Sequence, residues 1–128
     1  MPGKKTKRPV HLDLLRIRLP IGGIVSILHR VSGVLLVFLL PLMLLALQRS
    51  LTSNEGYIQV TGLLKSMPGR ATLLVLVLLL IHHFLAGIRH LLLDIDVGIS
   101  RSGSRRGAWL VIAGVAFVAI LIVVRLFL

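Results

Sequence analysis

The chain has 128 residues, of which 56% are hydrophobic and 15% charged, and its mean hydropathy is +0.99. A typical soluble domain has about 25% charged residues. The lower charged fraction and high hydropathy of this chain therefore exclude a water-soluble fold of this size. The net charge of +11 arises from basic residues that mostly border apolar runs, which is typical of membrane helices. The alternative, a nucleic-acid-binding tail, is rejected, and we predict an all-α membrane protein with no nucleic-acid partner.

The sequence predicts three transmembrane helices joined by polar connections. The first helix measures about 42 Å, longer than a hydrocarbon core of about 30 Å, so its first two turns are expected at the membrane boundary. In chain order, we expect a basic tail on the membrane surface over residues 1–20, helices over 21–48, 70–93 and 108–128, and connections over 49–70 and 94–107.

The distribution of Lys and Arg predicts the orientation in the membrane. The tail and the second connection together carry nine of these residues, whereas the flanks on the other side carry four. Because cytoplasmic flanks are enriched in Lys and Arg, we expect the N-terminus in the cytoplasm and the C-terminus in the periplasm of a bacterial inner membrane. Three helices make a thin bundle, so we also expect packing against a second membrane subunit.

Cysteine is absent from the sequence. Disulfides, covalently attached c-type haem and thiolate-ligated iron–sulfur clusters are therefore excluded for this chain. A redox centre held here would rely on histidine, carboxylate or methionine.

The first of two polar clusters lies early in the first helix, in Ser26-Ile27-Leu28-His29-Arg30. Ser26 and Arg30 are four residues apart and therefore share a helix face. A hydroxyl and a guanidinium on one face can hold a small polar oxygen, such as a quinone carbonyl, while aliphatic neighbours accept an apolar ring. The alternative is that Arg30 extends to lipid phosphates and Ser26 bonds to its own helix backbone.

The second cluster lies in the second helix, where His83, Gly87 and His90 share a face at i, i+4 and i+7. A neutral imidazole is a natural axial ligand for haem iron, and Gly87 is expected to leave room for the flat macrocycle. His82 is turned by about 100° from His83 and could be the ligand instead, although its face has no glycine. The alternative is that the histidines form hydrogen bonds between helices.

Helix geometry limits one iron to a single ligand from this helix. His83 and His90 are about 10.5 Å apart along the axis, whereas two axial ligands, each about 2 Å from the iron, lie within about 4 Å of each other. A six-coordinate haem on His83 would therefore take its second ligand from another chain. The residues that could meet the haem propionates at the membrane boundary are Arg30, His29, Arg89 and His90.

Both clusters resemble motifs of one known family. With part of the tail, they resemble the cytochrome b membrane-anchor subunit of succinate dehydrogenase, respiratory complex II. The match covers about a third of the chain. The matching stretches are Arg8-Pro9-Val10-His11-Leu12-Asp13-Leu14, Ser26-Ile27-Leu28-His29-Arg30-Val31-Ser32-Gly33, and His83 followed by Gly87-Ile88-Arg89-His90 and Asp94.

The resemblance implies a membrane anchor for a flavoprotein subunit and an iron–sulfur subunit. With a second small membrane subunit, such an anchor binds one b-type haem and ubiquinone, and electrons pass from succinate, oxidised elsewhere in the complex, to the quinone. Carried over by position, His83 is the axial ligand of the haem iron, and the partner supplies the second axial histidine. Ser26 and Arg30 contact the quinone, and the propionate region contains His29, Arg30 and His90.

Two alternatives stay open. A purely structural anchor would use its histidines and Ser26 only to hold helices together, and a haem spectrum would exclude it. An anchor of a fumarate reductase would serve the reverse reaction with a low-potential quinone. The motif in the first helix favours the succinate direction.

Overall fold

The computed structural model describes residues 19–127, and these residues are all-helical apart from short connections. They form α1 (Ile21–Thr52), α2 (Asn54–Lys65), α3 (Met67–Asp94) and α4 (Arg101–Phe127). Of these, α1, α3 and α4 are long and apolar enough to cross a membrane. The predicted all-α chain with three candidate spanning helices is therefore confirmed, while nearly all of the tail over 1–20 lies outside the described residues.

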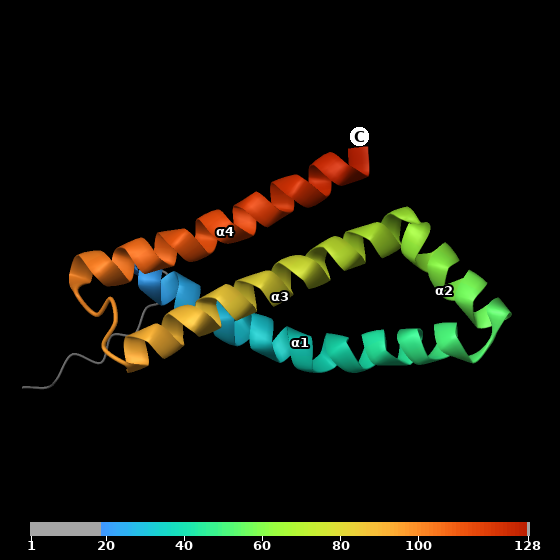
Figure 1. The fold of residues 1–128 in the computed structure, drawn as a ribbon, viewed down its shortest axis with the longest axis horizontal. Coiled ribbons are helices and arrows are strands. Elements are labelled where there is room, and N and C mark those ends of the chain that lie inside the picture. The colour runs from blue at the N-terminus through green and yellow to red at the C-terminus, as the bar shows by residue number, and fades with distance from the viewer. Residues whose placement is uncertain (1–18, 128) are drawn as a thin grey trace, which may run out of the picture.

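The three long helices meet at one end of the molecule (Figure 1). α1 and α3 run in opposite directions and cross, α4 packs against α3 and the beginning of α1, and α2 joins α1 to α3 at the far end. The buried core lies where the three long helices meet, and it contains Val25, Ala86, Ala108 and Val111. Two of these side chains are alanines, which let the helix backbones approach closely, as is common between membrane helices.

Two polar stretches that were expected to be connections are partly helical. The segment over 49–70 contains α2, and α4 begins at Arg101 rather than at residue 108. Each of these helices, like α3, has a serine before its first turn that satisfies a free backbone N–H group. The hydroxyl oxygens of Ser53, Ser66 and Ser100 accept hydrogen bonds from the N–H groups of Gly56, Gly69 and Gly103 at 3.0, 3.2 and 3.0 Å.

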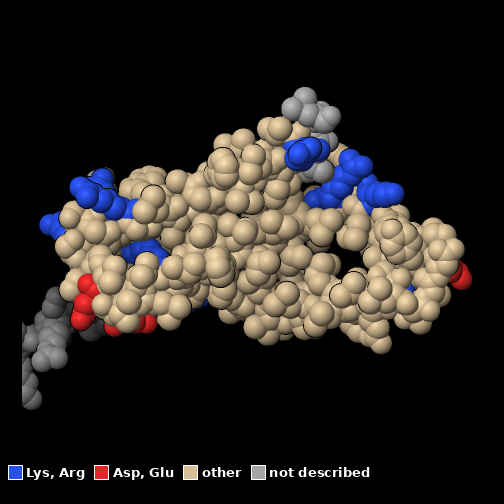
Figure 2. Space-filling model, viewed as in Figure 1, with Lys and Arg blue, Asp and Glu red and all other residues tan. Residues whose placement is uncertain are grey.

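The outer faces of the long helices are apolar. Figure 2 shows charged side chains toward the two ends of the molecule, with a broad band of other residues between them. Within α1, Val37 and Phe38 are 68% and 69% exposed. An apolar surface of this extent would be unfavourable in water, but it suits contact with lipid or with another membrane subunit.

Candidate functional site

The first predicted cluster divides between two faces of α1. Val25, His29 and Ser32 lie at i, i+4 and i+7, and this face packs into the molecule, where Val25 and Ser32 are buried and His29 is partly buried. Ser26 and Arg30 each follow one residue later, about 100° around the helix. Ser26 is partly buried and Arg30 is exposed. The pair thus lies beside the packing face, on a side of α1 that is open to a partner.

The structure brings His29 together with His83 and His90. The imidazole rings of His29 and His83 are stacked, with centroids 4.2 Å apart and planes 13° from parallel. The ring of His90 is tilted by 50° against that of His29, with centroids 5.1 Å apart. The expectation that His83 and His90 share a face is met, and that face meets α1 at the first motif.

The contacts of the His83 ring indicate its tautomer. Its Nδ1 lies 3.2 Å from the backbone oxygen of His29 and 3.2 Å from Oγ of Ser32. A carbonyl oxygen only accepts, so Nδ1 carries the hydrogen and the lone pair of the neutral ring is on Nε2. None of the hydrogen bonds between described residues uses Nε2 of His83. This is the form of histidine that binds a metal through Nε2.

Two glycines make space for these rings. A Cβ at Gly33 would lie 3.0 Å from Cε1 of His83, and a Cβ at Gly87 would lie 3.5 Å from Nε2 of His29. The neighbour of Gly87 in the structure is therefore the imidazole of His29, where the sequence suggested space for a macrocycle. Gly33 lies closer to His83 than Gly87 lies to His29, and its position in the sequence did not indicate this contact.

His82 differs from His83 in its surroundings. His82, Ala86 and Arg89 lie at i, i+4 and i+7 and therefore share one face of α3. On this face Ala86 and Arg89 are buried. The Nε2 atom of His82 is itself buried and has no hydrogen-bond partner among the described residues. A planar group would have to separate the helices to reach this nitrogen.

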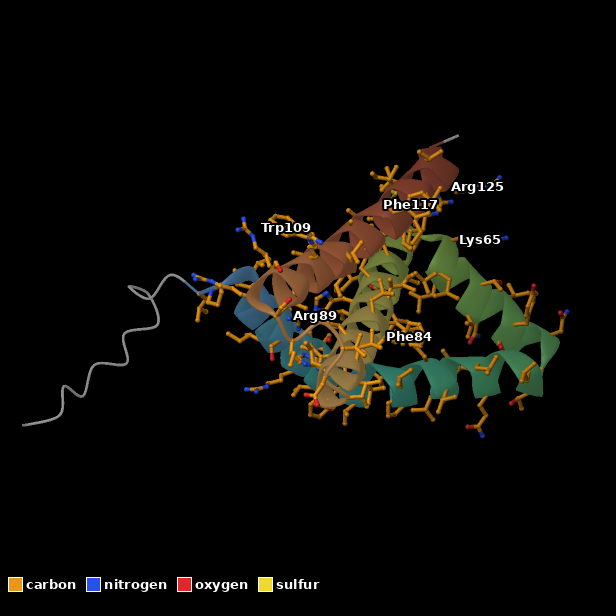
Figure 3. The ribbon with its side chains drawn as sticks, turned by 60° about the vertical axis from the view of Figure 1, so that its left-hand side comes forward. Lys65, Phe84, Arg89, Trp109, Phe117 and Arg125 are labelled. Carbon is orange, nitrogen blue, oxygen red and sulfur yellow. The ribbon has the colours of Figure 1, made fainter. Side chains whose placement is uncertain are left out.

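Arg89 lies between helices (Figure 3) and is 8% exposed. Its Nη2 donates to the hydroxyl of Ser104 at 3.0 Å and to the backbone oxygen of Ser104 at 3.3 Å. Gly22 and Gly107 leave room for the side chain, since added Cβ atoms would lie 3.0 Å from Nη2 and 3.6 Å from Nε. Arg89 is thus held by α4 through Ser104.

Ser104 makes a contact between α3 and α4 that the sequence did not predict. It lies in a polar stretch, 101–107, that was expected to be a loop, and no periodicity linked it to α3. The two glycines around it, Gly103 and Gly107, are the small-residue signal that could have indicated a close helix approach.

The histidines do not form a self-contained metal centre. Within residues 19–127, the structure has no group of three or more histidine or acidic side chains placed to hold one metal ion.

These features define a class: small helical membrane proteins in which polar histidine and serine groups meet between two spanning helices. The model of one family, described as the succinate dehydrogenase/fumarate reductase transmembrane subunit, matches residues 4–123. The chain belongs to this family.

Two curated relatives support the assignment. The chain is 38% identical over 118 residues to the succinate dehydrogenase cytochrome b556 subunit of Coxiella burnetii, covering 91% of this chain and 93% of the relative. It is 30% identical over 120 residues to the same subunit of Paracoccus denitrificans, covering 94% and 92%. The family resemblance of the two motifs is thus confirmed, and the chain is a multi-pass membrane subunit of a succinate dehydrogenase or fumarate reductase complex.

Proposed function

We propose that the chain binds one b-type haem through Nε2 of His83, jointly with a second small membrane subunit, and helps to form a ubiquinone-reduction site. In this role it passes electrons from succinate, oxidised in a flavoprotein subunit and relayed by an iron–sulfur subunit, to ubiquinone. The observation that carries the proposal is the His83 ring, whose Nδ1 is engaged by His29 and Ser32 while Nε2 is left without a protein partner among the described residues.

The residues fit a haem. His83 supplies a neutral imidazole, and both curated relatives are named cytochrome b556 subunits. When bound, the haem supplies a one-electron carrier. The second axial histidine comes from the partner subunit, because His83 and His90 are about 10.5 Å apart along α3 and one iron cannot take both. His29, Arg30 and His90 provide donors for the two propionates, with Arg30 contributing a permanent positive charge.

The quinone is held by the outward face of α1. Ser26 and Arg30 lie one turn apart beside the packing face, and Arg30 is exposed. Arg30 stabilises the negative charge that develops on a quinone oxygen during reduction, and the Ser26 hydroxyl donates a hydrogen bond to the same end of the ring. The partner subunits complete the pocket, since this face is open in the isolated chain.

The membrane is the bacterial inner membrane, with the N-terminus in the cytoplasm. The tail and the connection over 94–107 together carry nine Lys and Arg residues, against four on the other side of the membrane, and this supports the orientation. Succinate oxidation is favoured over the reverse reaction because both curated relatives carry the name succinate dehydrogenase.

Arg30→Leu tests the quinone role. In the assembled complex we expect succinate-driven quinone reduction to fall by about 100-fold or more, the size of effect seen when one charge-stabilising donor is removed. Succinate oxidation by a soluble dye should stay at the wild-type rate, because the flavoprotein is untouched.

Arg49→Leu is the matched control, since Arg49 is an exposed arginine at the other end of α1. Wild-type quinone reduction in Arg30→Leu would contradict the assignment. Loss of the dye reaction as well would show that Arg30 serves assembly of the complex.

A further inference from the structure

Ser32 is a buried polar side chain that contacts neither the haem nor the quinone in the proposed function. It is 1% exposed, on the face of α1 that packs into the molecule. A hydroxyl buried in an apolar surrounding is unfavourable unless it is hydrogen-bonded, so its partners indicate its use.

The hydroxyl of Ser32 connects two helices. It donates to the backbone oxygen of His29 at 2.8 Å. This bond uses its hydrogen and leaves an oxygen lone pair 3.2 Å from Nδ1 of His83, so the ring N–H donates to Ser32 and to the His29 carbonyl. Linked hydrogen bonds of this kind polarise and strengthen one another.

The His83 ring is confined on three sides. Ser32 and the carbonyl of His29 hold its Nδ1, the ring of His29 covers one face at 4.2 Å, and the backbone of Gly33 lies against its Cε1 edge. A side chain at Gly33 would have its Cβ 3.0 Å from that edge. Rotation of the ring and a change of tautomer are therefore both opposed.

We propose that Ser32 is a positioning residue for the haem ligand: with Gly33 behind the ring, it fixes the tautomer and orientation of His83 and lowers the haem potential. The inference rests on the proposed function, in which His83 binds the iron. A hydrogen bond from Nδ1–H makes the imidazole a stronger electron donor, which favours the ferric state.

A purely structural role for Ser32 makes a different prediction. Serines in helices often bond to a carbonyl of the preceding turn, and Ser50 does so in the same helix, at 2.7 Å from the oxygen of Leu47. The hydrogen bonds of His83 are to Ser32 and to the His29 carbonyl, so Ser50→Ala removes the same type of intrahelical bond without a hydrogen bond to the histidine.

The test compares Ser32→Ala, Ser50→Ala and His83→Ala in the purified complex. Haem content is measured by absorption, the midpoint potential by optical redox titration, and the orientation of the axial imidazoles by the largest g value of the ferric haem. We expect Ser32→Ala to keep its haem, to shift the potential to a more positive value and to change the g value. Ser50→Ala should match the wild type.

Three outcomes decide the matter. A wild-type potential and g value in Ser32→Ala, with haem lost in His83→Ala, would overturn the role of Ser32 alone. Haem retained in His83→Ala would instead overturn the proposed function. Should Ser32→Ala fail to assemble, Gly33→Ala is measured: a changed g value supports the positioning of the ring by this segment, and an unchanged one contradicts it.

Discussion

At the scale of single residues, polar groups inside a membrane helix have few partners, and here they partner one another. The Ser32 hydroxyl, the His29 carbonyl and the His83 ring form one connected group between α1 and α3. Such groups are costly in an apolar surrounding and are usually retained for function. The motif in α1 is thus divided: Ser32 and Gly33 lie against His83, while the partly buried Ser26 and the exposed Arg30 lie on the neighbouring face.

Gly87→Ala distinguishes two possible neighbours of Gly87, the ring of His29 and the haem macrocycle. A Cβ at this position would make ordinary contact with Nε2 of His29 at 3.5 Å, so we expect Gly87→Ala to keep wild-type haem content. Gly87→Leu should displace His29 and lower haem content. The measurement is haem per purified complex, by absorption.

The opposite reading places the macrocycle directly against Gly87. In that case the single methyl group of alanine would already reduce haem incorporation. A marked loss of haem in Gly87→Ala would therefore contradict the placement of His29 over this glycine.

At the scale of helices, Arg89 joins α3 to α4 through Ser104. Ser104→Ala removes the shorter of its two hydrogen bonds and leaves a buried guanidinium with the backbone oxygen alone. We expect the complex to lose about 1–3 kcal/mol of stability, because a buried charged donor is left without its partner. Thermal unfolding of the detergent-solubilised complex measures this loss.

Ser102→Ala is the control, since Ser102 is an exposed serine in the same first turns of α4. Equal stability of Ser104→Ala and Ser102→Ala would show that the contact between Arg89 and α4 adds nothing to the packing.

Hydropathy predicted the three long helices but not their polar ends. Lipid-facing helices are easy to predict from hydropathy because almost every residue in them is apolar. α2 and the first turns of α4 are polar, so hydropathy does not reveal them. Their starts depend on capping serines. Ser53 and Ser100 stand directly before these helices, and a search for capping residues would have found them.

Contacts between helices were the part that the sequence could not supply. Periodicity showed that His83 and His90 share a face, and that Ser26 and Arg30 share another. It did not show that the face of His83 meets His29, nor that Arg89 turns to Ser104. Those contacts follow from which helix faces pack together, and one sequence carries no direct record of that.

At the scale of the whole molecule, packing is concentrated where α1, α3 and α4 meet. Most of the remaining surface of the long helices is apolar, and the quinone-binding face proposed for α1 is open. A chain of this shape leaves large surfaces for lipid and for a second membrane subunit, in keeping with a site that is shared between subunits.

The orientation can be tested with single cysteines, because the chain has none of its own. Asn54 begins α2 at one end of the molecule, Ser102 lies near the start of α4 at the other, and both are exposed. We expect a membrane-impermeant maleimide to label Asn54→Cys in spheroplasts, and to label Ser102→Cys only after the membrane is opened. Labelling in the reverse pattern would place the N-terminus outside.

The most direct test of the haem site is a reduced-minus-oxidised absorption spectrum of the complex purified with its native partners. We predict a low-spin b-type α band in the wild type and in His82→Ala, and its loss in His83→Ala. A wild-type complex that retains its partner subunits but shows no such band would contradict haem binding. A band kept in His83→Ala and lost in His82→Ala would contradict the choice of ligand.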